Sequence, residues 1–328
     1  MLRHCSKGLP YARDRNMVSR TARGHLILLA LLWALPIGAQ APVPLSPAYL
    51  DQFDAQKTTA VLNNGEKLAY IDLGARDAPA FVLIHGYTDS ARDWALIAPL
   101  LLPRFRLIIL DLRGHGASGK PDCCYTRFDF AYDIKLLLDV LHISTADIAG
   151  HSLGSLVAQT FAEEWPASTR RLVLISSTGT SFGPAESARP STTPKSSYQG
   201  WLASLANLAD PINPDSAFML DWWKVSIAYN AEFARRQRRD AAAIPAQVWR
   251  AIADESLIGV DLATMLPRIQ ARTLLIWGGR DTLVSEAGRE TLRSGIKHPE
   301  VRDFPALGHD LFWEDPPAVA NVLINFLN

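Results

Sequence analysis

The chain has 328 residues, of which 48% are hydrophobic, and its formal net charge is zero. This length and apolar content suffice for a large core, and they exclude an intrinsically disordered chain. Because there is no excess of basic residues, we expect no nucleic-acid partner.

The N-terminus has the pattern of an export signal. Basic residues, including Arg20 and Arg23, precede the apolar run LILLALLWAL at residues 26–35, and Ala-Gln-Ala follows at residues 39–41. This order predicts a signal peptide over residues 1–41, with Met17 as an alternative start. The run is only about half of the roughly 20 residues that a membrane span needs. We therefore expect an exported, periplasmic or secreted protein without stable membrane insertion after cleavage, the alternative being an uncleaved anchor.

The chain after the signal is mildly acidic. Residues 42–328 carry a net charge of about −5, which suggests no polyanionic partner. Residues 42–56 are rich in proline and polar residues, and we expect a linker or N-terminal arm there. The two remaining cysteines, Cys123 and Cys124, are adjacent, and they form either a vicinal disulfide or two thiols. Without a second pair they are not a zinc site.

From residue 57 onward, short apolar runs alternate with amphipathic stretches. The runs predict strands, and the stretches between them predict helices. The expected strands are residues 67–73, 80–85, 106–111, 146–150, 172–176, 273–277 and 301–304, and the expected helices are 91–102, 128–141, 153–165 and 317–327. Such alternation predicts an α/β fold with a mostly parallel twisted sheet flanked by helices.

This alternation stops between residues 180 and 265. No buried-strand run occurs there, and prolines divide several helical stretches. We expect a helical cap over residues 180–265, inserted between two strands of a core formed by residues 57–179 and 266–328. The cap would cover the carboxyl edge of the sheet, where sites of α/β proteins form. It holds four of the nine tryptophans: Trp201, Trp222, Trp223 and Trp249.

Ser152 lies in the sequence Gly-His-Ser-Leu-Gly at residues 150–154, after a predicted strand and before a predicted helix. A sharp strand–serine–helix turn exposes the hydroxyl above the sheet edge, and Gly150 and Gly154 leave room for it. The helix N-terminus also points its free N–H groups at the reacting atom. The context predicts that Ser152 is a nucleophile.

A serine nucleophile needs a base and a carboxylate that orients it. His309 follows the last predicted strand in a loop that can reach over the serine, whereas His151 is too close along the chain. Asp281 directly follows a buried strand, at the same sheet edge. The chain order Ser152, Asp281, His309 is the order expected of one particular fold.

The oxyanion of an acyl-transfer reaction needs two N–H donors. We assign one donor to the N–H of Leu153, the residue after the nucleophile. The loop after the first buried strand, His85-Gly86-Tyr87-Thr88, predicts the other, and we assign it to the Tyr87 N–H.

With these residues in place, residues 57–328 resemble the α/β-hydrolase superfamily, in particular its capped esterase, lactonase and haloperoxidase-like members. The motifs that carry the resemblance are HGYTDS at 85–90, DLRGHGASGKPD at 111–122, GHSLG at 150–154, LLIWGGRD at 274–281 and LGHD at 307–310. The resemblance implies Ser152 as nucleophile, His309 as base, Asp281 as its orienter, and Tyr87 and Leu153 as oxyanion donors. It also implies that neither a cofactor nor a metal is needed.

Two departures narrow the expected activity. The short HG-Tyr motif differs from the HGGG loop of many lipases, which argues against a long-chain lipase. A serine at the elbow, where dehalogenases and epoxide hydrolases of the superfamily carry aspartate, disfavours both of those activities. We expect a hydrolase of a small-molecule carboxylic ester or lactone with an apolar or aromatic group. The alternatives are a carbon–carbon bond hydrolase of diketones with the same triad, and a non-catalytic ligand-binding receptor on the same fold.

One charged feature lies outside this site. Residues 235–239, Arg-Arg-Gln-Arg-Arg, predict either a contact with an anionic substrate or surface, or a solvated helix face. The sequence leaves the oligomeric state open.

Overall fold

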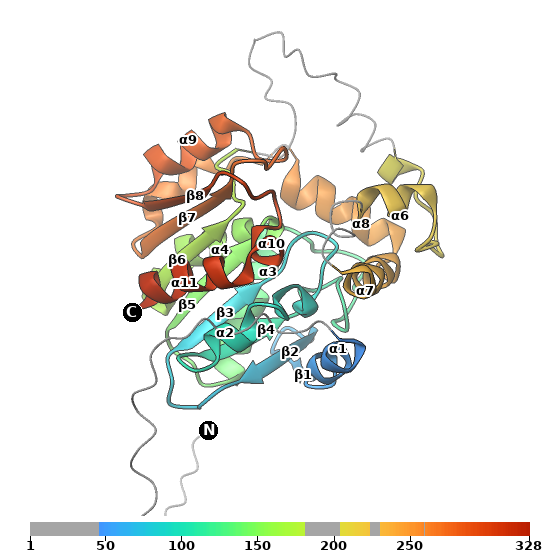
Figure 1. Cartoon of the computed structure of the whole chain (residues 1–328), viewed down its shortest axis with the longest axis horizontal. Coiled ribbons are helices and arrows are strands. Elements are labelled where there is room, and N and C mark those ends of the chain that lie inside the picture. Colours follow the sequence, from blue (N-terminus) through green and yellow to red (C-terminus); the bar gives the residue numbers. More distant parts are fainter. Residues whose placement is uncertain (1–45, 181–203, 224–229, 259) are drawn as a thin grey trace, which may run out of the picture. The chain divides into compact units, whose positions relative to one another are not determined.

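A computed structural model describes residues 46–180, 204–223, 230–258 and 260–328 of the chain. Its centre is one eight-stranded sheet in the order β1-β2-β4-β3-β5-β6-β7-β8 (Figure 1). The six strands from β4 to β8 in this order are parallel to their neighbours, whereas β2 is antiparallel to both β1 and β4. The prediction of a mostly parallel α/β sheet is confirmed.

The predicted strands and flanking helices lie close to their expected bounds. The strands are β1 (Thr58–Val61), β2 (Lys67–Leu73), β3 (Ala80–Ile84), β4 (Arg106–Leu110), β5 (Ala146–His151), β6 (Thr169–Ile175), β7 (Arg272–Gly278) and β8 (Glu300–Phe304). The helices of the core are α1 (Pro47–Asp54), α2 (Ala98–Leu101), α3 (Arg127–Val140), α4 (Leu153–Glu164), α9 (Glu286–Gly295), α10 (Leu311–Glu314) and α11 (Pro316–Leu327).

The sheet is buried by helices on both faces. Every residue of β3, β4 and β5 is buried, as expected of strands that are covered on both sides. The step from β3 to β4 and the step from β4 to β5 run in opposite directions across the sheet, so right-handed crossovers place α2 and α3 on opposite faces. Accordingly α3 packs against α4, and α2 packs against α11 (Figure 1).

The expectation of a linker over residues 42–56 is wrong for residues 47–54, which form helix α1. The Ser46 side chain accepts a hydrogen bond from the Tyr49 N–H at 3.1 Å, and Pro47 occupies the first turn. Leu50 and Phe53, three residues apart, are both buried. The polar composition hid this short amphipathic helix, which is held by its cap and by two apolar side chains.

One predicted helix and several short elements also differ from what the sequence predicts. The helix expected over residues 91–102 is divided into a 3-10 helix, η1 (Ala91–Trp94), and α2. Strand β1, at the edge of the sheet, is only 4 residues long, and it was not predicted. Helix α9 was not predicted either, because most of its residues are polar and only Gly288 and Leu292 are buried.

Between β6 and β7 the described residues form helices and no strand. These are α6 (Ala217–Trp222), α7 (Ala231–Ala242), α8 (Ala246–Ile252), the π-helical turn η4 (Ala253–Leu257) and the 3-10 helix η5 (Ala263–Arg268). The predicted helical insertion between two strands is therefore present, while Trp201 lies outside the described residues.

The predicted signal, residues 1–41, also lies outside the described residues. None of the described helices is long and apolar enough to cross a membrane. Cys123 and Cys124 form a vicinal disulfide, the first of the two alternatives considered for them.

Candidate active site

Ser152 lies at the sharp turn that the sequence predicts. Strand β5 ends at His151 and helix α4 begins at Leu153. Ser152 has φ 50° and ψ −118°, a conformation that L-residues rarely adopt, and its N–H donates to the carbonyl of Ile175 at 3.0 Å. The side chain remains partly exposed. The turn therefore holds the hydroxyl at the carboxyl edge of the sheet.

The two glycines of the motif make this turn possible. A β-carbon on Gly150 would collide with the main chain of Gly154. A β-carbon on Gly154 would collide with the carbonyl oxygens of Ile84 and His85 at the end of β3. Helix α4 can thus approach the sheet closely only because neither position carries a side chain.

Asp281 and His309 come together from the ends of neighbouring strands. Asp281 follows β7, His309 follows β8, and the His309 Nδ1 lies 2.9 Å from the Asp281 Oδ2. The other carboxylate oxygen, Oδ1, accepts hydrogen bonds from the N–H groups of Leu283 at 2.8 Å and Val284 at 3.3 Å. The carboxylate is therefore fixed in an orientation that faces the imidazole.

The two groups shift each other's pKa. Burial lowers the pKa of His309, but the charge and hydrogen bond of Asp281 outweigh burial, so the pKa is raised above 6.5. Burial raises the pKa of Asp281, yet the charge and hydrogen bond of His309 and the two loop N–H groups outweigh it, so the pKa is lowered below 3.8. An ionised Asp281 stabilises the protonated form of His309.

His309 is also tied to the serine turn. Its carbonyl oxygen accepts hydrogen bonds from the Ser176 Oγ at 2.6 Å and the His151 Nε2 at 3.1 Å. The rings of His151 and His309 lie 5.0 Å apart between centroids. His309 thus lies beside the residue that precedes Ser152. The Ser152 Oγ has no hydrogen-bond partner among the described residues.

The predicted oxyanion donors are the first residue of α4 and a residue of the loop after β3. Leu153 is the first residue of α4, so its N–H has no partner within the helix. The side chain of Tyr87 engages the cap: its hydroxyl donates to the Trp249 carbonyl at 2.6 Å, and its ring packs edge-on against those of Trp222 and Trp249. Which N–H groups receive an oxyanion remains a prediction.

His85 and His115 each bind a main-chain N–H group of a neighbouring loop. The His85 Nε2 accepts the Leu112 N–H at 2.9 Å, and the His115 Nε2 accepts the Thr88 N–H at 3.3 Å. Burial lowers the pKa of His85 to about 4 and that of His115 to about 3, so both rings are neutral at pH 7. They support the loops, and His309 remains the candidate base.

Asp111, a second acidic residue at a strand end, is already engaged. Its carboxylate pairs with the Lys57 ammonium at 2.9 Å and accepts the N–H groups of Ala91 and Ala117. These contacts hold the loops after β3 and β4, and they leave Asp281 as the carboxylate partner of His309.

Comparisons with known proteins agree with this architecture. A family model described as alpha/beta hydrolase fold matches residues 79–316. Since the match covers more than half of the chain, the protein belongs to the α/β-hydrolase fold family, as the sequence motifs indicate.

Individual relatives are distant. The chain is 27% identical to a 2-hydroxy-6-oxononadienedioate/2-hydroxy-6-oxononatrienedioate hydrolase of Escherichia coli, over 80% of this chain and 91% of that protein. A hydrolase structure from Pseudomonas aeruginosa superposes with a TM-score of 0.71 at 27% identity, over 83% of this chain and 98% of the other. The enol-lactonase of Burkholderia xenovorans has a TM-score of 0.67 at 22% identity, over 82% and 99% of the two chains, and this likeness shows the fold alone.

Proposed function

We propose that the protein is an exported serine hydrolase that cleaves a small carboxylic ester or lactone through an acyl-enzyme. The observation that carries the proposal is the Asp281–His309 hydrogen bond of 2.9 Å, held beside a strained serine at a strand–helix turn. A base with an orienting carboxylate is the arrangement that makes a serine hydroxyl nucleophilic at neutral pH.

In the proposed reaction the Ser152 Oγ attacks the carbonyl carbon while His309 takes the hydroxyl proton. Asp281 keeps its negative charge and stabilises the imidazolium that forms. The N–H groups of Leu153 and Tyr87 would receive the oxyanion. As the C–O bond breaks, His309 returns the proton to the leaving alcohol. His309 then takes a proton from the water that attacks the acyl-enzyme. It returns this proton to the Ser152 Oγ as the acyl bond breaks, which releases the acid and regenerates free Ser152.

Aromatic side chains of the cap support a substrate with an apolar or aromatic group. The ring centroids of Phe218 and Trp249 lie 5.8 Å apart, and those of Trp222 and Trp249 lie 5.4 Å apart. The Trp222 indole also donates to the Thr88 Oγ1 at 2.9 Å, which joins this aromatic group to the loop of Tyr87. Apolar walls with few polar anchors are typical of small-molecule sites.

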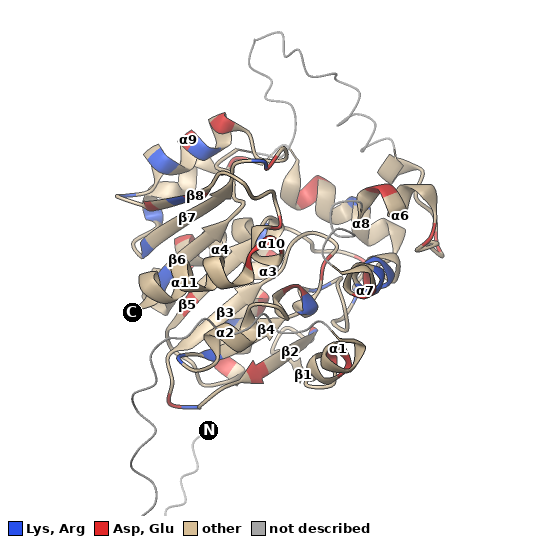
Figure 2. Cartoon of the chain, in the orientation of Figure 1, with Lys and Arg blue, Asp and Glu red and all other residues tan. Residues whose placement is uncertain are grey.

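The arginine run of α7 gives no support for a polyanionic partner. Figure 2 shows basic residues along this helix. Arg235 pairs with Glu232, Arg236 with Asp51, and Arg238 with Asp215. Because three of the four arginines in the run pair with carboxylates within the chain, we interpret this run as an ion-paired helix face.

Short p-nitrophenyl esters and lactones test the proposed activity. We expect turnover by the purified protein, and its loss by at least about 10³-fold in Ser152→Ala. Ser294→Ala, which removes an exposed serine hydroxyl from α9, serves as the matched control and should retain full activity. Labelling of the wild type by a fluorophosphonate, absent in Ser152→Ala, would identify the activated serine. Equal turnover by Ser152→Ala and Ser294→Ala would refute the assignment of Ser152 as the nucleophile.

A carbon–carbon bond hydrolase of diketones is the second candidate, favoured by the name of the Escherichia coli relative. It would use the same residues, with a carbon leaving group in place of the alcohol. Turnover of a vinylogous diketone with no turnover of esters or lactones would select it. Binding of such compounds without any turnover would instead indicate a receptor.

Export is tested at the N-terminus. Cleavage after Ala41 would leave Pro42 as the first residue. Mass spectrometry of periplasmic or secreted protein should find this N-terminus. Exported protein that begins at Met1 or Met17 would refute cleavage.

A further inference from the structure

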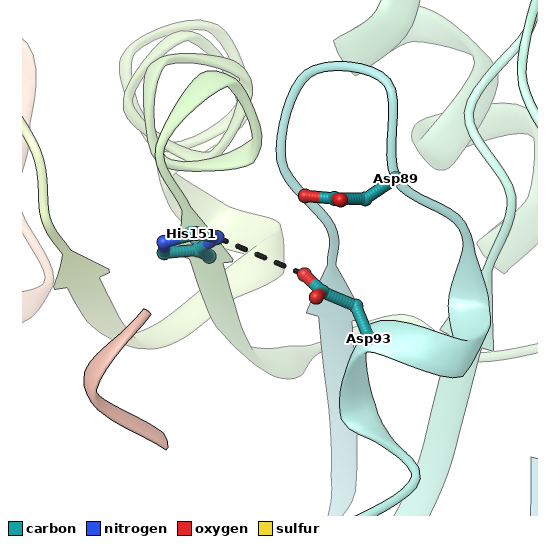
Figure 3. Close-up of side chains that lie close together, drawn as sticks. All are labelled: Asp89, Asp93 and His151. Carbon is teal, nitrogen blue, oxygen red and sulfur yellow. Dashed lines mark ion pairs between the residues drawn. The ribbon is translucent and has the colours of Figure 1, made fainter. Parts of the chain in front are cut away.

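Asp89, Asp93 and His151 form a buried cluster behind the serine turn (Figure 3). The two aspartates follow β3, and His151 is the last residue of β5. Their exposed fractions are 5%, 0% and 1%, and one ligand atom from each lies within 4.8 Å of the others. The Asp93 Oδ2 and the His151 Nδ1 are 3.7 Å apart. No pattern in the sequence indicates this cluster, because its members lie on separate elements.

Several polar atoms of the cluster lack hydrogen bonds. Within the described part of the chain, neither carboxylate oxygen of Asp93 nor the Nδ1 of His151 has a well-formed hydrogen bond, although the Gly86 N–H and the Trp313 indole lie close enough to Asp93 to lower its pKa. Figure 3 shows the imidazole and the Asp93 carboxylate facing each other. Burying such groups without partners costs several kcal/mol, so the arrangement calls for a bound group.

The hydrogen bonding of His151 leaves its Nδ1 available as a ligand. Its Nε2 lies 3.1 Å from the His309 carbonyl oxygen and 3.6 Å from the Asp310 Oδ1, both of which are acceptors. The Nε2 therefore carries the proton, and the Nδ1 lone pair faces Asp93. Metal-binding histidines commonly donate their second ring N–H to a carbonyl or carboxylate in this way.

Gly86 keeps the space between the ligand atoms free. A β-carbon on Gly86 would lie 2.6 Å from the Asp89 Oδ2 and 3.1 Å from the His151 Nδ1. Any larger residue would fill the point between these two atoms. The glycine thus has a reason to be at this position that does not depend on substrate binding.

We propose that Asp89, Asp93 and His151 bind one divalent transition-metal cation, with Zn²⁺ as the best match, and that this ion fastens the loop after β3 to the serine turn. Two carboxylates balance its charge, and an imidazole with carboxylate oxygens is a normal zinc ligand set. Zinc bonds of about 2.0–2.2 Å place ligand atoms of a tetrahedral site about 3.3–3.6 Å apart. The Asp93–His151 separation is near this spacing, and the third ligand closes in on binding. The ion is structural, and it takes no part in the proposed hydrolysis.

Zinc alone, added to tag-free, chelator-treated protein, tests the site. We expect one Zn²⁺ per chain by competition with a chromophoric chelator, and a rise in the thermal unfolding midpoint. Co²⁺ should give the visible absorption of a four- or five-coordinate site. Asp93→Asn should weaken zinc binding at least about tenfold. Asp139→Asn, which alters an exposed carboxylate on α3, is the control and should bind as the wild type does.

The alternative to a bound cation is protonation of the Asp89 and Asp93 carboxyl groups. Burial, the largest effect, raises the pKa of both Asp89 and Asp93 well above the ordinary value, so protons could neutralise them instead of a cation. Absence of stoichiometric zinc, or equal affinity in Asp93→Asn and Asp139→Asn, would overturn the proposal. If Asp93→Asn fails to fold, an unchanged unfolding midpoint of the wild type on zinc addition overturns it equally. Ser152→Ala should still bind zinc, so the outcome of the zinc test does not depend on the outcome of the hydrolysis test.

Discussion

At the scale of single residues, the proposed chemistry depends on one electrostatic pair inside the protein. Asp281 is 9% exposed, so its charge acts on His309 with little screening by water. The loop N–H groups that bind its second oxygen keep it ionised and fixed. The pair thus both orients the imidazole and raises its proton affinity.

This pair predicts a pH profile. In the proposed reaction the neutral form of His309 is the base, so kcat/KM should fall as the pH drops through its pKa, which lies above 6.5. In Asp281→Asn, kcat should drop about 10⁴-fold, and the midpoint of residual activity should move to lower pH because the charge of Asp281 no longer offsets the effect of burial on His309. Steady-state kinetics between pH 5 and 9 measures both effects. A midpoint unchanged by the substitution would contradict the assigned role of Asp281.

The same residues show what the sequence could predict. Ser152, Asp281 and His309 each lie at the end of a recognisable apolar strand or beside diagnostic glycines, and parallel strands bring their ends to one edge. Asp93 has no such signature: it lies in a 3-10 helix, and only the fold brings it to His151. Local patterns therefore indicated the candidate nucleophile and base, whereas the buried partners behind them depend on tertiary packing.

At the scale of elements, the buried strands were predictable because every residue of β3, β4 and β5 faces the core. Helix α1 was not, since its short apolar stripe is surrounded by polar residues. Helix α4 was predicted, although it is not apolar throughout as the buried strands are. It is buried along most of its length, and even Glu163, its penultimate residue, is only 7% exposed.

Glu163 should make stability depend on pH. Burial raises its pKa from 4.5 to about 7, so the unfolded chain ionises first as the pH rises. The carboxyl therefore contributes stability that is lost between pH 4.5 and 7, amounting to up to about 3 kcal/mol. Glu163→Gln, which stays neutral, should unfold at higher urea concentration than the wild type at pH 8, with a much smaller difference at pH 4.5. The neighbouring Glu164→Gln is the exposed control, and an equal effect of both substitutions would contradict the explanation.

At the scale of the whole molecule, one side chain joins three parts of the described chain. Arg92 on η1 donates to the Asp54 carboxylate of α1 at 2.8 Å and to the Asp240 carboxylate of α7 at 2.6 Å. It also donates to the Gln237 Oε1 at 3.3 Å. Its side chain is 8% exposed, so these contacts form within the protein and not at its surface. The N-terminal helix and the cap are thus fastened to the same loop that carries Tyr87.

Removing this connection should loosen the cap before the core. In Arg92→Met the two carboxylates lose their common partner, and because each remains about a quarter exposed, water can recover part of the loss. We expect a destabilisation of about 2–3 kcal/mol, at or below the low end for breaking a buried ion pair. Limited proteolysis should cut first between β6 and β7, and KM should rise more than kcat falls, because Tyr87 shares this loop. Arg293→Met, whose acidic partners are largely exposed, should change stability by less than about 0.5 kcal/mol. Equal protease resistance of the two variants would show that Arg92 does not hold the cap in place.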